Sequence, residues 1–134
     1  MSQNNNVEKY QTMQELQKQF QVLQQQIETL EKQVSELETV KESLSSIGKS
    51  EGKEEILVPL GAGVFIKGDL KGKEKIVMNV GANVVVEKNV EDASKLVNEQ
   101  IEKMTEIKGK LAEEVGEISM NLQTLQMELQ NIPQ

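Results

Sequence analysis

The chain has 134 residues, a net charge of −7, and neither cysteine nor histidine, so it lacks the usual thiolate and imidazole groups of enzymes and metal sites. Every basic residue is lysine, and without arginine, the usual residue for binding phosphates and bases, a nucleic-acid partner is not expected. Because the chain has no apolar window of about 20 residues and no basic leader, we expect a cytoplasmic protein with no membrane partner, no cofactor and no enzymatic activity.

The first predicted element is a helix over residues 7–47. Its apolar residues alternate at spacings of three and four, which is the heptad seam of a coiled coil. Lys41 stands in one seam position, and Gly48 is expected to end the helix. The seam consists of Met13, Leu16, Phe20, Leu23, Ile27, Leu30, Val34, Leu37 and Leu44.

Residues 54–88 contain two apolar, β-branched segments that align without gaps, 56–67 on 76–87. Each copy reads as a strand, a turn of Gly-Ala-Gly or Gly-Ala-Asn, and a second strand, which predicts two tandem β-hairpins. Glycine and asparagine are expected to supply the left-handed backbone of the turns. Pro59 cannot donate a ladder hydrogen bond, so its strand is expected at an edge or a bulge.

A second helix is predicted over residues 90–132. Asn89 is a suitable N-cap, acidic Glu91 and Asp92 follow in the first turn, and Pro133 ends the helix. Lys108 occupies a seam position, as Lys41 does in the first helix, and both lysines are expected to fix register and partner choice. This seam contains Val97, Ile101, Met104, Leu111, Val115, Ile118, Leu122, Leu125, Leu129 and Ile132.

Two helices of similar length on either side of the hairpins favour an antiparallel pair within one chain. The alternative is that each seam packs against a different chain, as in a parallel dimer. The predicted fold class is therefore α+β: a long antiparallel two-helix coiled coil with two central β-hairpins. Because two short apolar hairpins are not stable alone in water, we expect them to join equivalents from other subunits in an intersubunit β-barrel. The predicted assembly residues are Ile56, Val58, Leu60, Val64, Ile66, Ile76, Met78, Val80, Val84 and Val86.

The order helix, two tandem hairpins and helix, with the motifs at residues 57–68 and 80–88, resembles the alpha-class prefoldin subunit of archaeal type. Beta-class subunits carry one hairpin, so the doubled hairpin indicates the class. The resemblance implies a hexamer of two alpha and four beta subunits, a double β-barrel from which six coiled coils project, and an ATP-independent chaperone. It also implies that unfolded client proteins are captured at the coiled-coil tips and transferred to a group II chaperonin.

In an antiparallel pair the two chain ends meet at the tip, where seam residues can be partly uncovered. We therefore expect client contacts there, with Met120 and Met127 as weaker candidates because methionine is flexible and polarizable. Ordinary seam packing is the alternative role for each candidate. The predicted client-binding residues are Val7, Tyr10, Met13, Leu125, Leu129 and Ile132.

Two other functions fit the same pattern. The chain is a filament-forming structural protein if its hairpins polymerise, or an adaptor if its helices bind one defined partner by heptad matching. A nucleotide site at Gly61-Ala62-Gly63 is disfavoured because a strand, not a helix, follows it. The acidic pairs Glu54-Glu55 and Glu113-Glu114 are interpreted as solvated surface, because no other ligands cluster beside them in the sequence.

Overall fold

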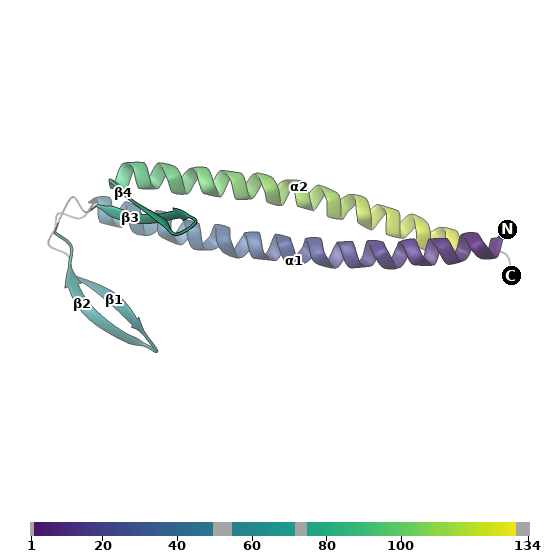
Figure 1. Cartoon of the computed structure of the whole chain (residues 1–134), viewed down its shortest axis with the longest axis horizontal. Coiled ribbons are helices and arrows are strands. Elements are labelled where there is room, and N and C mark those ends of the chain that lie inside the picture. The colour runs from purple at the N-terminus through teal and green to yellow at the C-terminus, as the bar shows by residue number, and fades with distance from the viewer. Residues whose placement is uncertain (1, 50–54, 72–74, 131–134) are drawn as a thin grey trace. The chain divides into compact units, whose positions relative to one another are not determined.

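The computed structural model describes residues 2–49, 55–71 and 75–130. Two helices, α1 (Ser2–Lys49) and α2 (Val90–Gln130), flank four strands (Figure 1). The strands are β1 (Glu55–Gly61), β2 (Val64–Asp69), β3 (Ile76–Gly81) and β4 (Val84–Lys88). The predicted α+β class, with two long helices around two β-hairpins, is confirmed.

The first helix is longer than the expected range of 7–47, because it begins at Ser2 and continues through Gly48 to Lys49. The prediction that Gly48 ends the helix is therefore wrong. A Cβ atom at Gly48 would lie 3.3 Å from Cγ1 of Val90, so the glycine allows the end of α1 to approach the start of α2 closely. At that start, the side chain of Asn89 accepts a 2.7 Å hydrogen bond from the backbone N–H of Asp92, which confirms the predicted N-cap.

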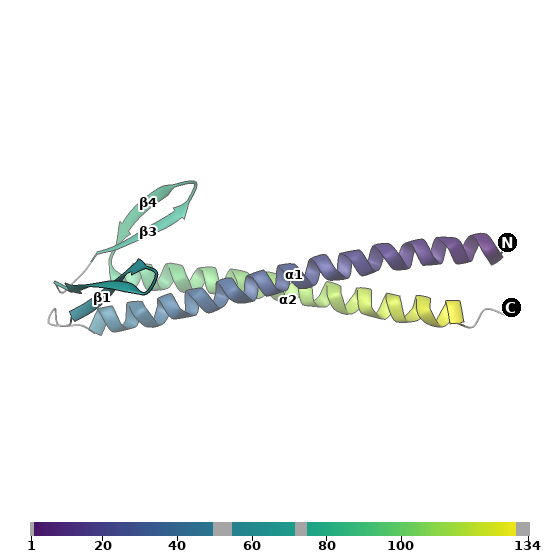
Figure 2. The same cartoon turned by 90° about the horizontal axis from the view of Figure 1, so that it is seen from below.

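The chain divides into two compact units. In the first, described over residues 2–34 and 103–130 and called here the terminal helix pair, segments of α1 and α2 run antiparallel with both chain ends at one end of the pair (Figures 1 and 2). An ion pair of 3.2 Å between Lys9 Nζ and Glu128 Oε2 joins the helices near that end. The predicted seam residues within these ranges are half-buried, and Ile118 is buried, as expected where each helix has one partner.

The second unit, residues 35–102, is called here the hairpin-bearing unit. Its core is a cluster of Leu44 from α1 with Ala93 and Val97 from α2, each at most 4% exposed. Two side chains of strand β3, Ile76 and Met78, pack against this cluster. The second hairpin is thus attached to the helices of its own chain by one face.

The two hairpins, β1–β2 and β3–β4, are separate two-stranded antiparallel sheets with matching registers. Val58 lies opposite Ile66 in the first, and Met78 lies opposite Val86 in the second. Both registers shift just before the turn, between Pro59 and Gly61 and at the equivalent place in the repeat. The predicted irregularity at Pro59 is present, and its recurrence where the repeat has no proline shows that the turn sequence also produces it.

Candidate functional site

The six predicted client-binding residues fall into three groups in the structure. Val7 and Tyr10 are 55% and 54% exposed, so their apolar surface is open to solvent. Met13, Leu125 and Leu129 are half-buried in the seam between α1 and α2. Ile132 lies outside the described residues.

Three of these residues come together at one place. Tyr10 and Met13 of α1 and Leu129 of α2 line an open pocket of about 270 Å³, with Gln126 and Gln130 completing the wall. The antiparallel pairing of the helices brings these side chains together across more than 110 positions of sequence. The lining combines apolar side chains with uncharged amides, a composition suited to contacting an apolar side chain and a nearby peptide group.

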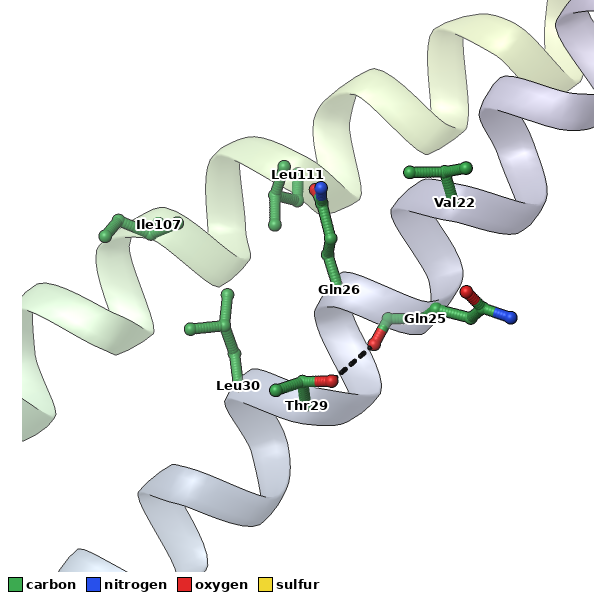
Figure 3. A pocket seen from close by; sticks show the side chains of 7 residues that line it. All are labelled: Val22, Gln25, Gln26, Thr29, Leu30, Ile107 and Leu111. Atoms are coloured by element: carbon green, nitrogen blue, oxygen red, sulfur yellow. Dashed lines mark hydrogen bonds between the residues drawn. The ribbon is translucent and has the colours of Figure 1, made fainter.

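A second concave surface lies farther along the terminal helix pair. It is an open groove of about 600 Å³ lined by residues of both helices (Figure 3). Val22 and Ile107 are 52% and 48% exposed at its walls, and the hydroxyl of Thr29 donates a 3.0 Å hydrogen bond to the carbonyl oxygen of Gln25. Sequence reasoning missed this groove, because Val22 and Ile107 lie outside the heptad seam. The sequence did contain a signal for the groove, because both residues are apolar at heptad positions that are expected to face solvent.

The hairpins carry apolar side chains on both faces. The predicted set of assembly residues took alternate positions, and Val58, Leu60, Val64 and Ile66 of that set are 41–65% exposed. The predicted set left out the apolar residues at the intervening strand positions, which point to the other face and are also exposed. The missed residues are Leu57 at 62%, Phe65 at 55%, Val77 at 61% and Val85 at 57%.

In the second hairpin the predicted assembly residues differ in how exposed they are. Val80 and Val84 are exposed and Val86 is half-buried, whereas Ile76 and Met78 pack partly against the Leu44 cluster of their own chain. The half-buried Ile56 of the first hairpin lies opposite Gly68. Isolated two-stranded sheets are only marginally stable in water, and exposed apolar side chains such as these are typical of surfaces that contact other chains.

No feature of a membrane span or metal centre was found in the described part of the chain. Neither helix, within residues 2–49 and 90–130, has an apolar stretch long enough to cross a bilayer. Across the described ranges, no three acidic side chains gather closely enough to hold a metal ion.

Comparison with known proteins identifies the same architecture. The family model of the prefoldin subunit matches residues 16–134. Among solved structures, a filamentous PFD from Methanocaldococcus jannaschii, determined by cryo-electron microscopy, is similar with a TM-score of 0.74 and 22% sequence identity. The match covers 93% of this chain and 98% of that one, and at this identity it shows a shared fold. A search of curated proteins finds no significant match.

Proposed function

This chain belongs to the prefoldin family, and from that membership we propose that it is an alpha-class subunit that holds unfolded proteins without nucleotide and catalyses no reaction. The family accounts for the chaperone-type role. The two hairpins between the helices support the alpha class, because the beta-class pattern has one. The proposed setting is the archaeal cytoplasm.

The proposed assembly is a hexamer of two alpha and four beta subunits built through the hairpins. Support comes from the apolar side chains that both faces of β1–β2 and the outer face of β3–β4 expose, including Leu57, Phe65 and Val85. Each hairpin has only two strands, so its outer edges are open to pairing with strands of neighbouring subunits. Closure of such strands into a β-barrel removes the open edges.

Client capture is proposed at the end of the terminal helix pair that carries the chain termini. The observation that carries this proposal is the exposed apolar surface of Val7 and Tyr10 beside the pocket that Tyr10, Met13 and Leu129 share. Unfolded proteins expose apolar side chains, and burial against such residues is favourable by about 25 cal/mol per Å² of apolar surface. The captured client is then proposed to pass to a group II chaperonin.

An aggregation assay on a denatured client protein tests the proposal. The assembled wild-type protein is expected to suppress light scattering, and the double variant Val7→Ser with Tyr10→Ser to be roughly fivefold less effective, or about 1 kcal/mol of binding. The matched control is Val22→Ser with Ile107→Ser, which removes similarly exposed apolar groups from the groove of the same helix pair. If the control loses as much suppression as the first variant, or if neither loses any, the chain-end site is wrong.

A structural role in filaments is the second candidate. Its support is the shared fold with a filamentous PFD and the open edges of the hairpins. Electron microscopy of the purified chain without beta subunits distinguishes the two. Long polymers favour the filament, whereas small oligomers that recruit beta subunits favour the chaperone hexamer.

A further inference from the structure

Two methionines lie on the outward side of α2. At the heptad position farthest from the seam, the helix carries Glu99, Glu106 and Glu113, followed by Met120 and Met127. Met120 and Met127, called here the outer methionines, are 69% and 62% exposed. The glutamates show that this position needs no apolar side chain for packing between the helices. The stability of the helix pair therefore does not explain why methionine stands there.

Three other methionines of the described residues are at least half-covered by neighbouring side chains. Met13 is half-buried and lines the pocket at the chain-end part of the terminal helix pair. Met78 packs against the core cluster of the hairpin-bearing unit, and Met104 is half-buried in the seam of α2. These three, called here the inner methionines, contribute to packing, whereas the outer methionines face water.

Methionine is the side chain of this sequence that oxidants attack most readily, because the chain has no cysteine, histidine or tryptophan. A lone pair of the thioether sulfur attacks one oxygen of a peroxide, and the S–O bond forms as the O–O bond breaks. The departing hydroxide takes up the proton of the transferred oxygen and leaves as water. The sulfur loses two electrons, the peroxide gains them, and the product is methionine sulfoxide.

The cost of this oxidation depends on where the sulfur lies. A sulfoxide is polar, so it disrupts packing at an inner methionine, where its oxygen is partly removed from water. At an outer methionine the new oxygen is hydrated and the seam is untouched. The same exposure gives access to a dithiol reductase, which returns the thioether and yields one disulfide and one water.

We propose that Met120 and Met127 form a protective oxidation site, which consumes two-electron oxidants such as peroxides and hypochlorous acid before the inner methionines react. The site is carried by the difference in exposure between the outer and inner methionines and by the position of the outer pair away from all packing. It gives these residues a chemical role separate from contact with clients.

Peptide mapping by mass spectrometry tests the inference on the full-length chain. The oxidant is hypochlorous acid at about two molar equivalents per chain, which gives the same sulfoxide with chloride and a proton as the other products. In the wild-type protein, each outer methionine is expected to carry at least about threefold more sulfoxide than each inner methionine. The unfolding midpoint, followed by circular dichroism of the helices, is expected to stay within about 1 °C of the untreated protein.

The decisive variant is Met120→Leu with Met127→Leu, which removes both outer thioethers and keeps apolar side chains of similar size. The same dose is expected to raise the sulfoxide at the inner methionines at least about threefold and to lower the unfolding midpoint by about 3 °C or more. The matched control, Met13→Leu with Met104→Leu, also removes two thioethers. It is expected to keep its untreated midpoint, because the outer methionines still take up the oxidant.

Equal sulfoxide at outer and inner methionines of the wild-type protein would overturn the inference. So would an unchanged yield at the inner methionines of the outer variant. If the oxidised wild-type protein keeps its unfolding midpoint but no longer suppresses aggregation, the outer methionines are an oxidation-sensitive contact, and the protective role is wrong. A wild-type protein that suppresses no aggregation before oxidation counts against the proposed function, while the sulfoxide distribution still decides the present inference.

Discussion

The two hairpins come from one repeated sequence but differ in what covers them. In β3–β4, Ile76 and Met78 pack against the cluster of Leu44, Ala93 and Val97. In β1–β2, Val58 is the residue equivalent to Met78 in the repeat, and it is 41% exposed. Similar local sequences form similar registers and turns, and burial depends on the helices that each hairpin reaches. Burial of β3–β4 couples its stability to the helices, and we expect the exposed β1–β2 to depend on contacts with other chains for its stability.

The largest effect is expected from a substitution in the cluster that packs against β3–β4, because it should destabilise that hairpin and not β1–β2. Leu44→Ala deletes a side chain that is 4% exposed and leaves a cavity, so the free energy of unfolding is expected to fall by about 3 kcal/mol. Hydrogen exchange should accelerate in β3–β4 and remain unchanged in β1–β2. Urea unfolding and exchange mass spectrometry of the isolated chain provide these measurements.

The control for this change is Val40→Ala on the same helix, where the side chain is 42% exposed and the expected loss is below about 1 kcal/mol. Equal acceleration of exchange in both hairpins would show that the cluster does not hold β3–β4 separately.

A matched pair of substitutions tests the hairpins themselves. Ile56 and Ile76 are equivalent in the repeat and both half-buried, but only Ile76 is packed against the helix cluster. Ile76→Ala is expected to lower the free energy of unfolding by about 1.5 kcal/mol, and Ile56→Ala by less than about 0.5 kcal/mol. Urea titration followed by circular dichroism compares them, and equal losses would contradict the asymmetry.

Much of the fold follows from local sequence patterns. Heptad spacing predicted the paired helices, and Gly-Ala-Gly and Gly-Ala-Asn predicted the two turns, because both signals lie within a few residues of one another. The packing of Met78 on Leu44 and Val97 is not encoded locally, since it depends on residues from three separate elements. Gly48 was misinterpreted for the same reason: its neighbour Val90 is distant in sequence.

The candidate site was partly predictable. Antiparallel pairing was enough to bring Tyr10, Met13 and Leu129 to the same end of the terminal helix pair. The exposure of Met120 and Met127, and the groove at Val22 and Ile107, depend on which side of each helix remains uncovered. Heptad assignment alone ranked the half-buried seam residues above these exposed groups, because it identifies the contact face and says less about the outer one.

The smallest expected effects come from substitutions in the turns of the two hairpins. Glycine and asparagine were expected to supply the left-handed backbone, yet Ala62 and Ala82 also have φ values of 51° and 50°. An L-residue with a Cβ atom is disfavoured there by roughly 1 kcal/mol, and asparagine tolerates the conformation better. Ala82→Asn is expected to raise the free energy of unfolding by about 0.5 kcal/mol, because its hairpin is packed on the helix cluster.

Ala62→Asn relieves the same strain in a hairpin with both faces exposed, so it should slow hydrogen exchange within β1–β2 while the unfolding midpoint of the helices stays constant. Both variants are measured by urea unfolding and exchange mass spectrometry under the same conditions. Equal shifts of the helix midpoint in both would mean that β1–β2 is coupled to the helices as strongly as β3–β4. In the proposed assembly, where neighbouring subunits cover the first hairpin, the Ala62→Asn gain is expected to appear in the stability of the assembly, because the hairpin would then unfold together with its partners.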